Sequence, residues 1–127
     1  MTSIRVLIVD DMAQVRRDLC TVLPLAGQAA GMEIEVVGEA GNGQEAIQQA
    51  AALRPDVVLM DLEMPVMDGC EATRQIKASS PDCRVIALTI HGDETARQRA
   101  IQAGVDDFIV KGAPMDSLIH AMTKEKE

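Results

Sequence analysis

The sequence contains almost no aromatic residues: Phe108 is the single phenylalanine among 127 residues, and tryptophan and tyrosine are absent. The core must therefore be aliphatic, with the eight methionines as filler. The sequence also lacks a long apolar run, since the first strand-like stretch, residues 6–9, is too short for a secretory leader or a membrane span. These absences predict a cytoplasmic protein that does not enter a membrane.

A cluster of basic residues is also missing. Twelve Lys and Arg residues are scattered among 20 Asp and Glu residues, which gives a formal net charge of -8. This balance argues against direct binding of a polyanion such as DNA, so any nucleic-acid role would belong to a separate domain or partner. The cysteines are odd in number and lack disulfide or metal-ligand spacing, so they are expected to be packing residues in a reducing compartment: Cys20, Cys70 and Cys83.

The most informative stretch is residues 57–69. It opens with four apolar residues that predict a short strand buried on both faces, and that strand ends in Asp61. Pro65 then stops regular structure, and Asp68 with Gly69 indicates the end of a loop. Because ligands in open α/β sheets bind beyond the carboxyl ends of the strands, Asp61 is predicted to be the working group of the protein.

The rest of the chain alternates between strand and helix patterns. Further strands are predicted at residues 6–9, 33–40, 84–89 and 108–110, and helices at residues 12–23, 43–53, 70–78, 94–103 and from 114 onward. Pro24 is expected to limit the first helix and residues 25–32 to form an irregular connection. Gly104 is expected to cap the fourth helix, and Pro114 suits the first position of the last one.

Five strands that alternate with five helices predict the α/β class, with right-handed crossovers that give a parallel sheet covered on both sides. We expect a doubly wound (βα)5 fold with the flavodoxin-like strand order 2-1-3-4-5. The length of 127 residues fits one domain, 1–127. The charged residues 123–127 are expected to begin a linker if this domain is the N-terminal part of a longer protein.

Polar residues follow four of the predicted strands: Asp10 and Asp11, Asp61, Thr89, and Lys111. The carboxyl ends of these strands lie along one edge, so three carboxylates would share one crevice. Two like charges about 4 Å apart repel by about 4 kcal/mol at an effective dielectric of about 20, and a hard divalent cation such as Mg²⁺ would resolve that conflict. With Mg²⁺ bound, the crevice suits a phosphoryl group, with Asp61 as nucleophile and Thr89 and Lys111 as hydrogen-bond and charge partners.

Four motifs occur in this order along the chain: V-D-D at 9–11, L-M-D-L-E-M-P-V-M-D-G at 59–69, A-L-T at 87–89 and F-I-V-K at 108–111. Together they resemble the receiver domain of two-component response regulators, the CheY-like family, over essentially the whole chain. Two positions differ from the commonest family pattern, since Ile90 stands where a small residue is usual and Gly112 where proline is usual. Both resemble receivers of the NarL/FixJ type, whose full-length regulators carry a helix-turn-helix output domain.

The resemblance implies the chemistry of the site. Asp61 would accept a phosphoryl group from a sensor histidine kinase or a phosphotransfer protein, and Lys111 would bind the phosphate. Asp11 would ligate Mg²⁺ directly, Asp10 would hold it largely through water, and the backbone carbonyl of Glu63 would add a ligand. The domain would catalyse its own phosphorylation and dephosphorylation without being a metabolic enzyme.

The resemblance also implies a route to the output. Thr89 and Phe108 would form a switch pair, and the response would pass through the surface made by the fourth helix, the fifth strand and the fifth helix. The partners implied are an output domain or a partner protein, and a homodimer that forms on phosphorylation.

Several of these residues also fit plainer roles. Asp10 and Asp11 could supply the negative charge that a helix N-terminus favours, and Asp61 could begin a turn. Phe108 could be a core residue, and His91 is interpreted as a solvated loop residue near the mouth of the site. The coincidence of five groups at one edge, rather than any single residue, favours a phosphoryl site.

Three other functions are compatible with parts of the pattern. Residues 41–46 match the G-x-G-x-x-A of dinucleotide-binding proteins, but they do not follow the first strand, and they also fit an ordinary strand-to-helix turn. A haloacid-dehalogenase-like phosphatase uses an aspartate nucleophile, yet it expects D-x-D after its first strand, whereas here D-L-E follows the third. A docking domain that takes no phosphate is disfavoured because no member of the phosphoryl site is missing.

Overall fold

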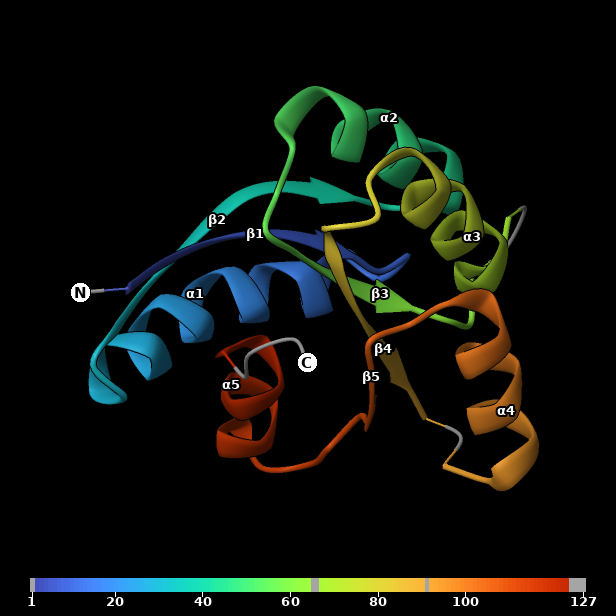
Figure 1. The fold of residues 1–127 in the computed structure, drawn as a ribbon. Coiled ribbons are helices and arrows are strands. Elements are labelled where there is room, and N and C mark those ends of the chain that lie inside the picture. The colour runs from blue at the N-terminus through green and yellow to red at the C-terminus, as the bar shows by residue number, and fades with distance from the viewer. Residues whose placement is uncertain (1, 65–66, 91, 124–127) are drawn as a thin grey trace.

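One parallel sheet of five strands forms the centre of the computed structural model, which describes residues 2–64, 67–90 and 92–123 (Figure 1). The strands lie in the order β2-β1-β3-β4-β5, and each neighbouring pair is parallel. Their bounds are Thr2–Val9 for β1, Met32–Ala40 for β2, Val57–Asp61 for β3, Arg84–Thr89 for β4 and Asp107–Val110 for β5. The predicted strand order is confirmed.

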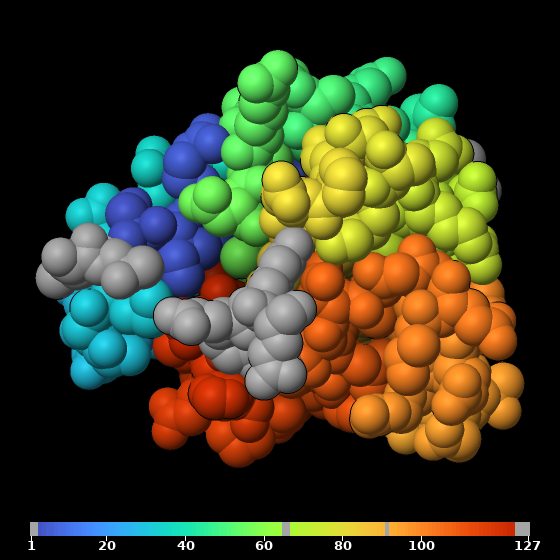
Figure 2. Space-filling model, viewed as in Figure 1, coloured from blue at the N-terminus to red at the C-terminus, as the bar shows by residue number. Residues whose placement is uncertain are grey.

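Helices cover both faces of the sheet. Their bounds are Ala13–Ala29 for α1, Gly43–Leu53 for α2, Gly69–Ser79 for α3, Glu94–Ala103 for α4 and Met115–Thr123 for α5. Figure 1 shows α1 and α5 on one face and α2 and α3 on the other. The space-filling view shows α4 packed beside α3 (Figure 2). This arrangement is the doubly wound α/β fold that the alternation of patterns predicts.

The sheet divides the apolar interior into two layers. In β1, Val6 and Ile8 belong to the layer under α1 and α5, whereas Leu7 and Val9 belong to the layer under α2 and α3. Successive side chains of a strand point to opposite faces, so a strand covered on both sides must be apolar throughout. Every residue of β3 and β4 is accordingly buried, including the polar residues at the strand ends.

The prediction that Pro24 limits the first helix is wrong. Helix α1 continues through Pro24 to Ala29, so most of the segment predicted to be irregular is helical. An interior proline costs a helix about 3 kcal/mol, but the turn after it packs closely on the sheet. A Cβ on Gly27 would lie 2.8 Å from the side chain of Ile34, which shows how close the helix and β2 are. Tertiary packing therefore outweighs the local signal.

The last helix begins one residue later than predicted. Pro114 lies immediately before α5 rather than at its first position, and its carbonyl oxygen accepts a hydrogen bond of 3.0 Å from the Ser117 N–H. Thr123 belongs to α5, and the rest of the predicted linker, residues 124–127, lies outside the described residues. In the part of the chain that the structure describes, no helix has the length and apolar character to cross a membrane.

Candidate phosphoryl site

The carboxyl edge of the sheet gathers three carboxylates. Val9 and Met60 are register partners in neighbouring parallel strands, so the residues that follow them, Asp10 and Asp61, lie at the same level. A carboxylate oxygen from each of these residues and one from Asp11 lie within 4.8 Å of one another. Asp10 and Asp61 are each only 1% exposed, whereas Asp11 is exposed.

Lys111 brings a positive charge to the two buried carboxylates. It follows β5, and its backbone N–H donates a hydrogen bond of 2.7 Å to the Thr89 carbonyl, which fixes it beside the end of β4. Its Nζ lies 3.0 Å from Asp10 Oδ2 and 3.4 Å from Asp61 Oδ1. The structure therefore brings together four residues that the sequence places far apart: Asp10, Asp11, Asp61 and Lys111.

Backbone hydrogen bonds orient both buried carboxylates. Asp10 Oδ1 accepts from the Met12 N–H at 2.9 Å, and Asp61 Oδ1 accepts from the Glu63 N–H at 3.0 Å. In both cases the side chain bonds to the backbone two residues on, as Asp does where regular structure ends. The chain turns at the strand end while the carboxylate stays at the sheet edge.

Burial and mutual repulsion shift the ionisation of these groups. Desolvation, and then the charge of Asp10, raise the pKa of Asp61 to about 7, although the Glu63 N–H and Lys111 oppose the shift. Burial alone would lower the pKa of Lys111, but its hydrogen bond to Asp10 and the charge of Asp61 outweigh burial and raise that pKa. Lys111 therefore stays charged, whereas ionisation of Asp61 lowers the stability of the folded protein.

The side chain of Thr89 is directed at Glu63. Thr89, fully buried at the end of β4, donates its hydroxyl proton to Glu63 Oε1. The Leu62 N–H bonds to the Leu88 carbonyl at 3.1 Å and so extends the pairing of β3 and β4 by one residue, which brings Glu63 beside Thr89. The sequence did not predict this contact, because only the backbone carbonyl of Glu63 was expected to take part.

The other positions singled out from the sequence lie in β5 and in the loops after β4 and β5. Phe108 is half-buried in β5 and is the register partner of Ala87 in β4. The side chain of Ile90 is 64% exposed. Gly112 adopts a φ of +95°, in the left-handed region that favours glycine. His91 lies outside the described residues.

Gly69 is a further residue of the site whose role the sequence did not reveal. A Cβ at this position would lie 2.3 Å from the Asp61 carbonyl oxygen and 2.9 Å from the Leu62 Cα, both backbone atoms. The first turn of α3 therefore presses against the end of β3, and only glycine fits there. The D-G pair predicted the loop end, but sequence could not show which backbone the glycine approaches.

The G-x-G-x-x-A segment is a helix-capping turn. The Asn42 side chain accepts a hydrogen bond of 2.9 Å from the Glu45 N–H, and the Glu45 carboxylate accepts one of 2.9 Å from the Gly41 N–H. These two bonds account for the motif as the start of α2. The plainer interpretation of residues 41–46 fits this geometry.

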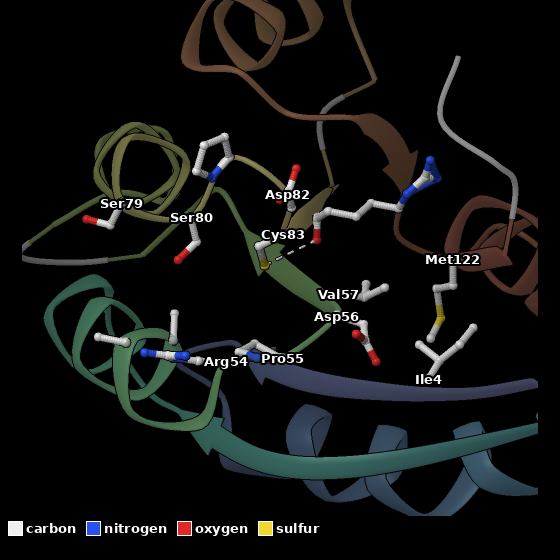
Figure 3. A pocket seen from close by; sticks show the side chains of 14 residues that line it. Ile4, Arg54, Pro55, Asp56, Val57, Ser79, Ser80, Asp82, Cys83 and Met122 are labelled. Carbon is white, nitrogen blue, oxygen red and sulfur yellow. Dashed lines mark hydrogen bonds between the residues drawn. The ribbon is translucent and has the colours of Figure 1, made fainter.

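A second hollow lies at the opposite, amino edge of the sheet. It has a volume of about 680 Å³, and its walls come from the starts of β1, β3 and β4 and from the end of α5. Figure 3 shows Ile4 and Met122 side by side at one end and Arg54 and Ser80 toward the other. The acidic cluster belongs to the other edge, so this hollow and the reactive groups do not coincide.

The donor set of the acidic cluster fits Mg²⁺. This ion prefers hard oxygen ligands and keeps several waters, so it needs few carboxylates and an open side. Asp10 and Asp61 supply buried carboxylates, and Asp11 supplies one that faces solvent. Burial and then the charge of Asp10 raise the pKa of Asp61, and a bound cation would offset both. Receiver domains bind Mg²⁺ at such an acidic cluster.

Comparison with known proteins identifies the class. The pattern described as "Response regulator receiver domain" matches residues 6–123. The chain belongs to the response regulator receiver domain family, whose members are signalling domains of two-component systems and not metabolic enzymes. Nothing in the comparison supports a haloacid-dehalogenase-like phosphatase.

Individual relatives agree with the family. The chain is 42% identical over 122 residues to response regulator protein VraR of Staphylococcus aureus, an alignment that covers 96% of this chain and 56% of VraR. It thus spans about half the length of that relative. The signal receiver domain of the putative response regulator NarL from Mycobacterium tuberculosis superposes with a TM-score of 0.83 at 28% identity, covering 98% of this chain and 100% of that one.

A third similar structure is a CheX–CheY–BeF3–Mg²⁺ complex from Borrelia burgdorferi. A chain of that complex has a TM-score of 0.82 and 25% identity to this protein, and the match covers 93% of this chain and 85% of that one. With the NarL match, it confirms both the CheY-like fold and the likeness to NarL-type receivers.

Proposed function

We propose that Asp61 accepts a phosphoryl group from the phosphohistidine of a sensor histidine kinase or a phosphotransfer protein, and that the domain switches its output surface in response. The observation that carries the proposal is the Lys111 ammonium, 3.0 Å from Asp10 and 3.4 Å from Asp61 beside an exposed third carboxylate. Three carboxylates around one ammonium hold excess negative charge, which suits a site that takes a cation and then a phosphoryl group.

The transfer balances without a further reactant. A carboxylate oxygen of Asp61 forms a bond to phosphorus, the bond from phosphorus to the imidazole nitrogen breaks, and the electron pair leaves with the imidazole. The Lys111 ammonium would pair with the phosphoryl oxygens, which its distance of 3.4 Å from Asp61 Oδ1 supports, and Thr89 would donate a hydrogen bond to one of them. Hydrolysis of the mixed anhydride by water returns the Asp61 carboxylate and inorganic phosphate.

Asp10, Asp11, Asp61 and the Glu63 backbone carbonyl would hold Mg²⁺. When bound, Mg²⁺ supplies positive charge that offsets the oxygens of the transferring group. The similarity to a chain of the CheX–CheY–BeF3–Mg²⁺ complex supports Mg²⁺ binding by this domain.

The output would leave through the loops after β4 and β5. Lys111 already lies 3.4 Å from Asp61 Oδ1. Thr89 donates to Glu63 and would reach a phosphoryl group on Asp61 only if the loop after β4 moves inward, which would change the surface of α4, β5 and α5 and give Phe108 room to turn. A shift from 1:99 to 99:1 needs about 5.5 kcal/mol of preferential stabilisation. One hydroxyl contact is worth less, about 1 kcal/mol. An output domain, a partner protein or a homodimer would complete the shift.

The half-length match to VraR supports a larger protein. In this proposal residues 1–127 form the single receiver domain of a longer regulator. The residues after Thr123 begin a linker that leads into an output domain. Nucleic-acid binding would belong to that output domain, because the receiver carries a formal net charge of -8.

Labelling with a small phosphodonor tests the proposal. Acetyl phosphate with Mg²⁺ should place one hydroxylamine-labile phosphate on the protein, seen by mass spectrometry, and Asp61→Asn should abolish it. Asp56→Asn is the matched control, because Asp56 lies at the amino edge, where its carboxylate accepts from the Arg5 N–H at 2.9 Å. Undiminished labelling of Asp61→Asn would contradict the assignment of the acceptor.

A second experiment follows the output surface. Hydrogen exchange with and without beryllofluoride, which mimics the phosphoryl group, should show protection changes that cluster in residues 89–122. Thr89→Ala should blunt these changes while Asp61 remains open to phosphorylation. Changes confined to residues 12–54 would contradict the proposed route.

A further inference from the structure

The Thr89 hydroxyl has a single proton to donate. In this structure it donates that proton in a hydrogen bond to the Glu63 side chain. Thr89 Oγ1 donates to Glu63 Oε1, so the hydroxyl proton is already engaged in a hydrogen bond. The phosphoryl group of the proposed function needs the same proton, because Thr89 must donate to one of its oxygens. A hydroxyl cannot donate its one proton to both acceptors at once.

We propose that the Glu63 side chain is a positioning residue that holds Thr89 in the resting orientation and opposes activation. This inference rests on the proposed function and deepens it, and the hydrogen bond from Thr89 to Glu63 is called the latch below. Opening the latch is the step that makes the Thr89 hydroxyl available to Asp61.

Glu63 is placed to link the acceptor to the switch. Its backbone N–H donates to Asp61 Oδ1 at 3.0 Å, while its side chain accepts from Thr89. One residue therefore contacts the reacting carboxylate through the backbone and the switch hydroxyl through the side chain. A substitution at position 63 removes the latch and leaves the backbone N–H and carbonyl in place, so the two roles can be separated.

The latch faces α4 rather than the acidic cluster. Glu63 and Thr89 line a cavity of about 320 Å³, whose other walls include Cys70 of α3 and Asp93, Ala96 and Arg99 around α4. Asp93 caps α4 through a hydrogen bond of 2.8 Å from the Ala96 N–H. When the Thr89 hydroxyl turns toward Asp61, the end of β4 leaves this cavity, and the following loop carries the change to the start of α4.

Exchange of the latch for the phosphoryl contact replaces one oxygen acceptor with another. Thr89 donates one hydrogen bond before and after the exchange, so the loss of the old bond offsets much of the gain from the new one. Replacing Glu63 removes the bond that has to be broken and leaves the bond that Thr89 forms with the phosphoryl group. The resting protein should therefore respond more readily to a phosphoryl mimic when Glu63 is absent.

A beryllofluoride titration in Mg²⁺ measures this response. Amide NMR is the suitable readout, since the chain has no tryptophan or tyrosine. We expect Glu63→Ala to bind beryllofluoride about tenfold more tightly than the wild type, which corresponds to about 1.4 kcal/mol. Glu63→Gln, which keeps the volume and a neutral acceptor, should give a smaller gain. Glu71→Ala, which removes an exposed carboxylate of α3, is the control and should give none.

Thr89→Val separates the latch from simple charge repulsion. It removes the hydroxyl and keeps the shape, so Glu63→Ala should give no gain when combined with it. Without Mg²⁺ or any phosphoryl mimic, Glu63→Ala and Thr89→Val should each speed amide exchange at Ile90 and Gly92, and the double variant should add nothing.

Three results would overturn the latch. They are a Glu63→Ala variant that binds beryllofluoride no more tightly than the wild type, a gain that persists in the Thr89→Val background, and exchange at Ile90 and Gly92 that ignores both substitutions. A wild-type protein that binds no beryllofluoride in Mg²⁺ would instead refute the proposed function, and this inference with it.

Discussion

Charged residues have opposite effects on the folded state at the two edges of the sheet. At the amino edge, Asp56 accepts from the Arg5 N–H at 2.9 Å, and Asp106 accepts both from Lys77 Nζ and from the Val85 N–H at 2.8 Å. At the carboxyl edge, Asp10 and Asp61 are almost fully buried and repel one another, with one lysine between them. The charged residues of the amino edge link neighbouring elements, whereas the buried carboxylates of the carboxyl edge destabilise the folded state.

The difference shows that the destabilising residues of this fold are gathered at the carboxyl edge. Buried like charges are costly, and proteins keep them where the chemistry requires them. The amino edge contributes hydrogen bonds that tie β1 to β3 and α3 to β4. The carboxyl edge depends on that support, because its own electrostatics favour unfolding. Substitutions at the two edges should therefore have effects of different size, and at some positions of different sign.

The largest expected effect is at Gly69. Gly69→Ala forces a Cβ within 2.3 Å of the Asp61 carbonyl, so backbone must shift, and we expect a loss of about 3 kcal/mol in the free energy of unfolding. Gly31→Ala is the control, since Gly31 has a φ of +78° but no atom within 4 Å of the added Cβ, and it should cost about 1 kcal/mol. Urea melts measure both. Equal losses would mean that the carboxyl edge has room to relax.

Lys111 should matter more at high pH than at low pH. Lys111→Gln leaves two buried carboxylates without their cation, and we expect a loss of about 2 kcal/mol at pH 8, reduced from the value for a fully buried pair because Lys111 is partly exposed. The loss should shrink at pH 5, where Asp61 is protonated. The comparison is Lys77→Gln, which leaves Asp106 with the Val85 N–H at the other edge of the sheet, so its loss should not follow the ionisation of Asp61. A pH-independent loss in Lys111→Gln would contradict the coupling.

Asp61 should make the stability of the metal-free protein fall as pH rises. Its pKa is about 7 in the folded state and about 3.9 in an unfolded chain, so the folded state binds more protons between these values. The free energy of unfolding in EDTA should therefore decline from about pH 4 to about pH 7 through this group. Asp61→Asn should remove that part of the slope, as urea melts across this range can show. Parallel curves for the two proteins would count against the raised pKa.

The smallest effect, of opposite sign to most substitutions, is expected at Asp11. Asp11→Ala removes one of three neighbouring carboxylates and should stabilise the metal-free protein by less than about 1 kcal/mol, because Asp11 is exposed and screened. The same variant should bind Mg²⁺ more weakly, which isothermal titration can measure. A variant less stable than the wild type in EDTA would show that the edge is not under repulsion.

Apolar pattern predicted most of the fold. The bounds of β4 and α4 agree with the sequence pattern to the residue, because continuous apolar runs and a glycine cap are local signals. The continuation of α1 through Pro24 depends on packing against Ile34, which a local pattern does not contain. A rule about proline in isolated helices therefore failed where the sheet supplied the missing free energy.

The site was predictable as a set of positions but not as a network. Strand ends placed Asp10, Asp61, Thr89 and Lys111 along one edge, because topology alone decides which loops meet. Topology does not decide which acceptor holds a hydroxyl proton. The bond of Thr89 to Glu63 depends on one residue of extra pairing after β3, and the close approach of Gly69 depends on the angle at which α3 leaves.

The burial of Asp61 has a consequence for directed evolution. A screen that rewards only survival of heating should enrich asparagine at position 61, since the amide can still accept from the Glu63 N–H while the cost of burying a second carboxylate beside Asp10 disappears and Lys111 keeps its 3.0 Å contact with Asp10. Each such variant would withstand heating better than the wild type and bind a cation more weakly. A library sorted by heat alone would thus drift toward chains that persist but cannot respond, and any thermostabilised receiver of this type needs a selection for cation binding beside it.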